Sequence, residues 1–249
     1  MTEKYTWEQA RETIKEASKE KDTIELSAIF SCFSWDNLKT LEISRNGDAR
    51  IALSNQNKSK STLILVPYES QVKEINNLKN KKIKAKLFNP KEKFPISEAY
   101  DLVYAEWISH SWLENENFLK QMLQASKKYF LIVMPSLNSD DTKLASINNP
   151  KEKDRRKKLI ETIKSFLKKD NWQAHFKEKY LPLSFPDKET TKKTFVTLAF
   201  NNNLTKEQEA KLDSFLTEDR IKNFNDSFYI ILGEKNKPSK PYTTRTSST

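Results

Sequence analysis

The chain has 249 residues, of which 36% are hydrophobic, enough for one large domain with a sizeable core. Its single cysteine, Cys32, excludes an internal disulfide, and its two histidines, His110 and His175, are too few and too far apart for a zinc site. No apolar run approaches the roughly eighteen residues that cross a bilayer, and the first residues lack a secretory signal. We therefore expect a cytoplasmic protein without a membrane span.

The formal net charge is +10 at pH 7, which would ordinarily indicate a polyanionic partner. Only seven of the 44 basic residues are arginine, however, and the chain has two glycines where about 7% is usual. Lys, Asn and Ile have AT-rich codons and Gly has GC-rich ones, so we attribute most of the basicity to genome composition. Nucleic acid is an open partner class that the composition does not favour, because specific contacts use Arg forks and stacked aromatics that are not clustered here.

The first predicted element is an amphipathic helix over residues 6–20, which begins with a capping box of Thr6 and Gln9. From Thr40 onward, short apolar runs alternate with helical patterns, which is typical of β-α-β units and a parallel sheet. The predicted strands are 40–43, 62–66, 83–88, 101–104 and 130–134, and the predicted helices are 50–55, 69–79, 117–126 and 152–168. We expect the Lys and Arg residues of the last helix to form a solvated face.

The pattern changes after Trp172. A short strand is predicted within residues 173–183, followed by helices over about 185–222 that include a second capping box, Thr205 with Gln208. The continuous apolar run at 227–235 is typical of a strand buried on both faces. Residues 236–249 are rich in Pro, Ser, Thr and Lys and are predicted to be disordered, which leaves a single domain over 1–235.

Several sequence segments, and their order along the chain, resemble the class I S-adenosylmethionine-dependent methyltransferases. "TLEISRNGDARIAL", residues 40–53, resembles the first strand and cofactor loop of that family, and "YDLVYAEWISHSWLENENFLKQMLQASKKYFLIVMPS", residues 100–136, is similar to its fourth strand, switch, helix and fifth strand. The resemblance covers roughly residues 25 to 235. It implies an α/β Rossmann-like methyltransferase fold: a mostly parallel seven-stranded sheet, helices on both faces, and a helical insertion before the last strand.

The resemblance also implies a cofactor crevice beyond the carboxyl ends of the strands, where the strand order reverses. Glu42 matches the acid of the first strand. The three glycine positions of the family's loop fall on Ser44, Asn46 and Asp48 if they are aligned directly from Glu42, whereas a one-residue insertion would put Gly47 on the middle glycine. Both alignments stay open, and either keeps at most one glycine, so the loop offers less room for a ligand against its backbone.

Two further cofactor positions are replaced. Pro67 stands where the family has the acid that holds the ribose, and Glu69 could substitute or could simply be a surface residue in the first turn of a helix. Asn89 stands where the family commonly has Asp near the adenine; it could accept a hydrogen bond from the adenine amino group, or Asn89-Pro90 could simply be a turn.

The loop after the fourth predicted strand carries the candidate catalytic residues, Glu106 and His110. His110 could act as a general base toward an acceptor hydroxyl or amine, since its ordinary pKa lies near neutrality, or it could be structural. Trp107 and Trp112 could wall a pocket or belong to the core. Two functions follow from the resemblance. One is S-adenosylmethionine-dependent methyl transfer to a small molecule; the other is a non-catalytic member of the fold that serves as a binding or scaffold subunit, for RNA or a protein partner.

Overall fold

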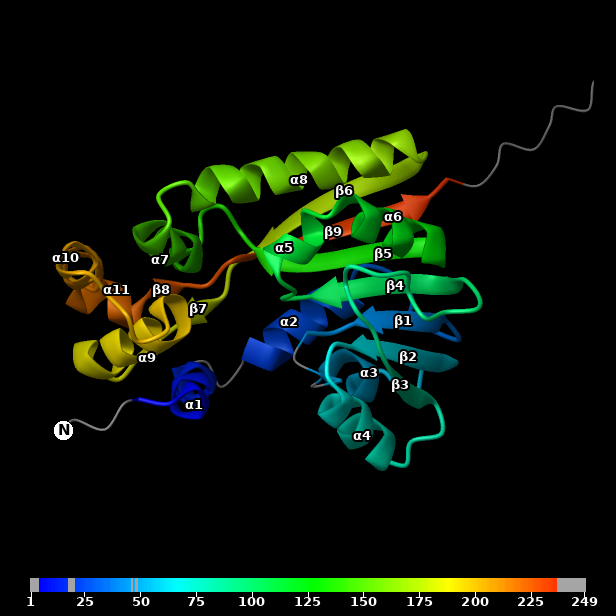
Figure 1. Ribbon diagram of the computed structural model, residues 1–249, viewed down its shortest axis with the longest axis horizontal. Helices are drawn as coiled ribbons and strands as arrows, with labels where there is room; N and C mark the ends of the chain where they lie inside the picture. The colour runs from blue at the N-terminus through cyan, green and yellow to red at the C-terminus, as the bar shows by residue number, and fades with distance from the viewer. Residues whose placement is uncertain (1–4, 18–20, 46, 48, 237–249) are drawn as a thin grey trace, which may run out of the picture.

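The computed structural model describes residues 5–17, 21–45, 47 and 49–236. Its main sheet has seven strands in the order β3-β2-β1-β4-β5-β9-β6, in which only β9 is antiparallel to its neighbours (Figure 1). The strands are β1 (Lys39–Ile43), β2 (Ser61–Val66), β3 (Ile83–Leu87), β4 (Tyr100–Glu106), β5 (Ser126–Pro135), β6 (Trp172–Lys179) and β9 (Phe228–Lys235). The strand order reverses between β1 and β4, so a crevice is expected at their carboxyl ends.

Helices cover both faces of the sheet because alternate residues of each buried strand point to opposite sides. On one face, buried residues of β4 such as Leu102 and Tyr104 pack with α2 (Lys21–Phe30) and α3 (Arg50–Ser54), and α4 (Glu69–Asn77) covers β2 and β3. On the other face, Val103 and Ala105 pack with α6 (Glu116–Ala125) and α8 (Glu152–Lys169).

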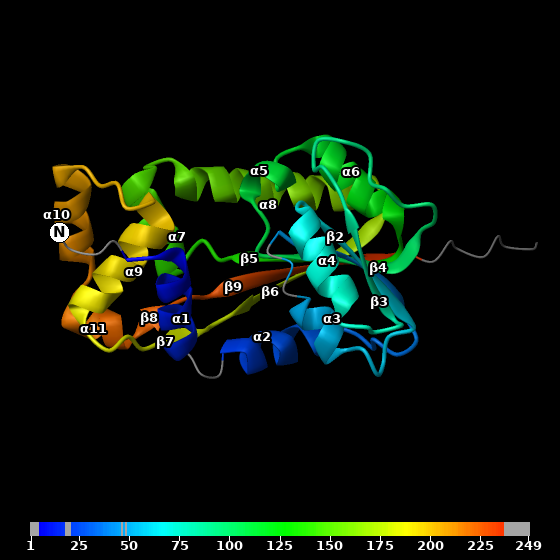
Figure 2. The same ribbon diagram turned by 60° about the horizontal axis from the view of Figure 1, so that its bottom comes forward.

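A group of helices lies beyond the carboxyl ends of the parallel strands. Between β6 and β9 the chain forms α9 (Lys188–Phe200), α10 (Lys206–Phe215) and α11 (Glu218–Lys222), bracketed by the short paired strands β7 (Pro182–Leu183) and β8 (Phe224–Asn225). We call α9 to α11 the helical insertion. Helix α1 (Trp7–Ala17) packs on α9, and α7 (Asp140–Asn148) contacts α8, α9 and α10, so this end of the molecule is helical (Figures 1 and 2).

The structure confirms the predicted sheet, with helices on both faces and an insertion before the last strand. Both predicted capping boxes are present: Thr6 and Gln9 exchange hydrogen bonds of 2.7 and 3.1 Å, and Thr205 and Gln208 do the same at the start of α10. The helix predicted over 6–20 corresponds to α1, with residues 18–20 outside the described residues. Helices α2, α5 (His110–Leu113) and α7 were not predicted, and the tail lies outside the described residues from 237 onward.

In the part of the chain that the structure describes, no helix is both long enough and apolar enough to cross a lipid bilayer.

Candidate functional site

A buried acid lies where the strand order reverses, between β1 and β4. Glu42 is fully buried on β1, and its register partner on β4, Tyr104, donates a hydrogen bond of 2.6 Å to its Oε2. At the end of β1 the buried Ser44 accepts a hydrogen bond of 2.9 Å from the backbone nitrogen of Gly47 and so fixes the turn that follows. Asn46 and Asp48 lie outside the described residues.

Gly47 is required by both its backbone angle and its surroundings. Its φ is +68°, in the left-handed region that favours glycine, and a Cβ there would lie 2.9 Å from the side-chain carbons of Gln71 in α4. The Gln71 amide also donates to the backbone oxygen of Arg45 at 3.0 Å. The bare backbone of this turn is therefore covered by the protein's own side chain.

Arg50, the first residue of α3, joins the end of β4 to α2. Its guanidinium contacts Glu106 at the end of β4 at 2.6 Å, and Glu25 and Asp22 of α2 at 2.6 and 2.5 Å. The Glu25 and Glu106 side chains are only 1% and 5% exposed. Burial alone would lower the pKa of Arg50, but the two glutamates raise it above its ordinary value, so the guanidinium stays charged. Glu106, a predicted catalytic residue, is thus one member of a compact ion cluster.

At the ends of β2 and β3 the two remaining cofactor candidates lie apart from this cluster. Glu69 is exposed in the first turn of α4. Asn89 is exposed and bonds within its own loop, where its Oδ1 accepts from the backbone nitrogen of Lys91 at 3.0 Å and its amide donates to Glu92 at 2.8 Å. A cavity of about 460 Å³ adjoins Pro67 and Asn89.

The loop after β4 turns through a strained residue. Trp107 has φ of +49°, which for a bulky residue costs on the order of 1–2 kcal/mol. Its backbone nitrogen bonds Val133 on β5 at 3.1 Å, and its ring packs edge-on against Phe228, with ring centroids 6.1 Å apart. These contacts hold Trp107 against the ends of β5 and β9. Trp112, by contrast, packs against Phe88 in the core.

His110, the other predicted catalytic residue, begins α5 (His110–Leu113) and contacts the start of α8. Its Nδ1 lies 3.2 Å from Glu152, which also accepts a hydrogen bond of 3.0 Å from Arg156. Arg156 in turn contacts Asp141 at 2.8 Å and Thr142 at 2.6 Å. The hydrogen bond from His110, opposed by burial and helped by Arg156, lowers the pKa of Glu152 to about 2.

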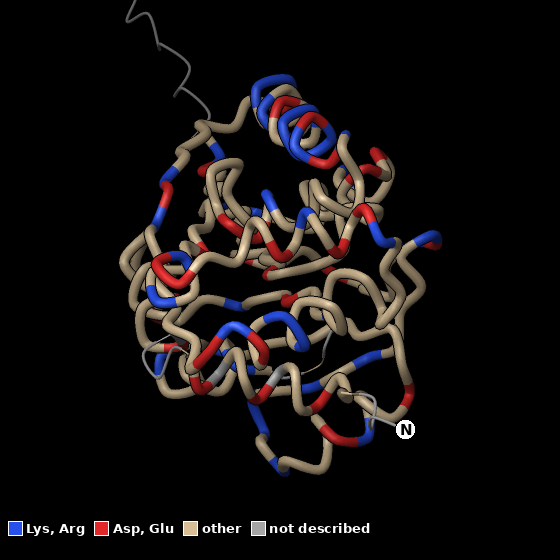
Figure 3. The backbone as a smooth tube through the Cα atoms, turned by 90° about the vertical axis from the view of Figure 1, so that its left-hand side faces the viewer, with Lys and Arg blue, Asp and Glu red and all other residues tan. Residues whose placement is uncertain are grey.

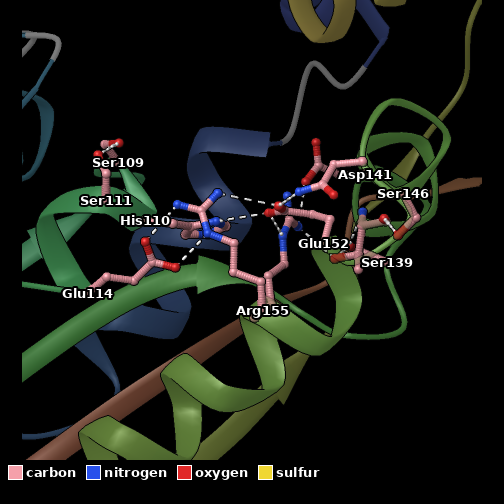
Figure 4. A network of polar contacts seen from close by, with 12 residues as sticks. Ser109, His110, Ser111, Glu114, Ser139, Asp141, Ser146, Glu152 and Arg155 are labelled. Carbon is pink, nitrogen blue, oxygen red and sulfur yellow. Dashed lines mark hydrogen bonds and ion pairs between the residues drawn. The ribbon is translucent and has the colours of Figure 1, made fainter.

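Arg155 extends this network toward solvent (Figure 4). It makes a two-point contact with Glu114, at 2.5 and 2.8 Å, and lies 3.4 Å from Glu152. The hydrogen bonds from Arg155 lower the pKa of Glu114. The expectation of a solvated basic face on α8 is wrong for Arg156, whose side chain is 6% exposed, whereas Arg155 is 38% exposed and remains accessible.

Two adjoining cavities open at this edge of the sheet. We call the first the basic pocket: it measures about 450 Å³ and is lined by residues 107–111 with Arg45, Pro135 and Arg155. We call the second the insertion pocket: it measures about 540 Å³ and lies between α7, the start of α8 and the helical insertion, with an apolar wall that includes Leu144, Leu183, Phe195, Leu198 and Phe224. Both are lined by Trp107, Pro135 and Arg155, so they adjoin there.

The predicted site residues thus separate into groups. Glu42, Ser44 and Gly47 lie at the end of β1, near Glu106 across the crevice; His110 faces α8; Glu69 and Asn89 lie at the ends of other strands. Sequence reasoning missed four arginines of this edge: Arg45, Arg50, Arg155 and Arg156. The signal that could have found them is their rarity, because a lysine-rich chain that keeps arginine at four places near one site uses the planar fork of that residue.

Comparison with known proteins gives matches in structure but not in sequence. No family model matches the chain, and no curated protein matches it. Among solved structures, the YcgJ protein of Bacillus subtilis is 10% identical with a TM-score of 0.61, over 86% of this chain and 98% of that one. A putative methyltransferase of Bacillus halodurans is 13% identical with a TM-score of 0.55, over 87% and 100%.

A cyclopropane-fatty-acyl-phospholipid synthase-like protein of Lactobacillus casei is 12% identical with a TM-score of 0.59, over 88% of this chain and 92% of that one. Identities this low carry information about the fold alone. Together with the strand order and the single antiparallel strand, these similarities show that the chain has the Rossmann-like methyltransferase fold.

Proposed function

We propose that this chain is a non-catalytic protein with the methyltransferase fold, which binds a ligand in the basic and insertion pockets and does not use S-adenosylmethionine. The observation that carries the proposal is the position of Arg50. Its guanidinium lies at the carboxyl ends of β1 and β4, where the resemblance implies the methionine end of the cofactor.

The charge of Arg50 explains why it competes with that cofactor. S-adenosylmethionine carries an ammonium and a sulfonium besides its single carboxylate, so it is a net cation, and the two cationic groups need carboxylates or acceptor oxygens around them. Here Glu106, Glu25 and Asp22 surround Arg50, and Glu42 accepts a hydrogen bond from Tyr104. Three of these four acids therefore already pair with the protein's own cation, and a cationic ligand that used them would have to displace Arg50.

The other predicted cofactor positions also argue against binding of S-adenosylmethionine. Gln71 covers the backbone of Gly47, Pro67 offers no carboxylate to a ribose, and Asn89 uses its amide within its own loop. The residues present do not fit S-adenosylmethionine in the manner that the resemblance implies, and we derive no reaction through it.

The proposal is tested by thermal denaturation with S-adenosylmethionine and S-adenosylhomocysteine. A micromolar site would stabilise the protein by about 4 kcal/mol at a thousandfold excess of ligand over Kd, which raises Tm by on the order of 10 °C. We expect no shift with either compound at millimolar concentration. A shift of that size, lost in Glu42→Ala, would refute the proposal.

The second candidate is S-adenosylmethionine-dependent methyl transfer to a small molecule, with Glu42, Ser44, Asn46, Gly47, Asp48, Glu69 and Asn89 toward the cofactor and His110 and Glu106 at the reaction centre. One observation favours it: the basic pocket lies at the ends of β1, β4 and β5 and adjoins the insertion pocket, so two ligands could meet there. Transfer of a labelled methyl group from S-adenosylmethionine to a small molecule, in a mixture of candidate acceptors, would establish this function.

A further inference from the structure

The two pockets differ in their chemistry, and the difference defines a class of ligand. The basic pocket has two arginines and no Asp or Glu among its lining residues. Arg45 is exposed at the end of β1 and makes no ion pair with any residue that the structure describes. Arg155, on the other side, is oriented by its two-point contact with Glu114 and still exposes its guanidinium. A cation without an ionic partner among the described residues, next to an oriented one, favours an anionic group.

Hydroxyl groups complete the lining of the basic pocket. Ser109 and Ser111 lie side by side, with their Oγ atoms 2.7 Å apart, and Figure 4 shows them beside the network of His110 and Arg155. Only one of the two hydroxyls donates in this mutual contact, so the pair still has a proton to donate to an oxyanion. Carboxylate and phosphate groups both accept hydrogen bonds of this kind.

The insertion pocket has a different character. The charged groups that line it near α8, Glu152, Arg156 and Asp141, are paired with one another, so they require no charge from a ligand. Its remaining wall contains Asn148, Asn149, Arg155 and Asp226 and is otherwise aliphatic and aromatic, from Leu144 on α7 to Phe195 and Leu198 on α9. A cavity of about 540 Å³ with such a wall is in the size range of small-molecule sites and gains free energy by burying apolar surface.

Trp107 connects the two pockets. It lines both of them, and its left-handed backbone angle holds the indole at their junction. A residue kept in a costly conformation beside a cavity is typical of a binding site. We propose that the basic and insertion pockets together bind one amphipathic anion, with its carboxylate or phosphate head between Arg45 and Arg155 and its apolar chain beneath the helical insertion.

This assignment names the ligand class of the binding site in the proposed function and rests on that function. It is tested by calorimetric titration of the full chain with four ten-carbon probes below their micelle-forming concentrations: decanoate, decyl phosphate, decanol and decylamine. We expect saturable one-to-one binding of at least one anion and at least tenfold weaker binding of the alcohol and the amine. Binding of decanoate alone or decyl phosphate alone identifies the head group.

Two variants place the ligand. Arg45→Gln removes an exposed cation without breaking an ion pair among the described residues and should weaken anion binding about tenfold while leaving the weak decanol binding unchanged. Leu198→Trp fills the insertion pocket and should abolish binding of every probe. Lys84 is exposed on β3 and lines neither pocket. Lys84→Gln is therefore the matched control for loss of one positive charge, and this variant should bind the probes like the wild type.

Three outcomes would overturn the assignment: no binding of either anion at millimolar concentration, decanol binding as tightly as decanoate, or an Arg45→Gln variant that binds anions like the wild type. These outcomes are distinct from failure of the proposed function. Binding of S-adenosylmethionine refutes the non-catalytic proposal whatever the amphiphiles do, whereas failure of the amphiphiles removes the ligand class and leaves the closed cofactor crevice untouched.

Discussion

Arg50 holds together three elements that are far apart in the sequence. It begins α3, and its guanidinium joins Glu106 at the end of β4 to Glu25 and Asp22 of α2. Removing one member of such a buried cluster is costly because the others lose their compensation, while replacing the whole cluster by neutral groups costs far less. We therefore expect replacement of Arg50 alone to lower the free energy of unfolding markedly.

Arg50→Met should lower the free energy of unfolding by about 3–5 kcal/mol, because Glu25 and Glu106 stay buried without their cation. The double variant Arg50→Met/Glu106→Gln should recover part of that loss. Urea denaturation at pH 7 measures both. Arg45→Met is the matched control and should change the value by less than about 0.5 kcal/mol, since Arg45 is exposed. An Arg50→Met variant as stable as that control would show that the cluster contributes nothing.

Glu152 predicts a pH dependence. Its folded-state pKa is lowered to about 2, from an ordinary value of 4.5, by the His110 hydrogen bond and Arg156. The stabilisation from ionised Glu152 is therefore complete above about pH 4.5 and is lost as the pH falls through 2. Glu152→Gln should destabilise the protein at pH 7 by on the order of 1–2 kcal/mol. Urea denaturation should show this difference shrinking steadily between pH 4.5 and 2, and a difference independent of pH would contradict the assignment.

For single residues, the sequence predicted positions in the fold but not the residues that they contact. Glu106 and His110 were expected in the loop after β4 and lie there, yet their contacts, Arg50 and Glu152, are 56 and 42 positions away along the chain. The spacing of residues within one segment of the chain does not predict such pairs. Whether either residue takes part in chemistry stays a prediction, but their contacts show that both are bound within charged networks.

Among the elements, the turns show how a glycine-poor chain folds. Of the eight described residues with positive φ, seven are not glycine, and four of these are asparagine: Asn37, Asn171, Asn201 and Asn202. Asparagine tolerates the left-handed region better than most residues, so it takes the place that glycine usually has. The remaining three, Ala49, Lys79 and Trp107, have no such tolerance, and their conformations are held by the surrounding structure.

Lys79 provides a test of this interpretation. It follows the end of α4 with φ of +52°, at the position where glycine commonly ends a helix, and it is exposed. Lys79→Gly should therefore raise the free energy of unfolding by about 1 kcal/mol. Lys81→Gly, two residues later and without a positive φ, should give no gain. Urea denaturation of the two variants side by side measures the difference, and equal values would contradict the interpretation.

The strands were predictable because buried parallel strands are short apolar runs, and all five predicted in the first part of the chain are present. Four agree with their predicted bounds within two residues, whereas β5, predicted over 130–134, begins four residues earlier at Ser126. Helix α2 was missed because Ile24, Leu26 and Ala28 alternate with polar residues over part of its length, a period typical of strands. Its buried residues Ala28 and Ile29 belong to the same cluster as Leu102 and Tyr104 of β4, and such packing is a tertiary property that the local sequence does not show.

For the whole molecule, the charge distribution agrees with a small-molecule site better than with a polyanion site. Seen from the end that carries the helical insertion, Lys and Arg alternate with Asp and Glu over the described chain (Figure 3). Ion pairs within the helical insertion, such as those of Lys192 with Glu209 and Asp213, neutralise part of the basic charge at this end. RNA binding that weakens steeply with salt would nevertheless establish the nucleic-acid alternative.

The central claim, that Arg50 closes the cofactor crevice of a methyltransferase fold, is tested most directly by calorimetric titration of the wild-type protein with S-adenosylmethionine. The account predicts no heat beyond dilution at ligand concentrations up to about 1 mM, a concentration at which even a site with a millimolar Kd would be partly occupied. A saturable one-to-one isotherm with a micromolar Kd would contradict it.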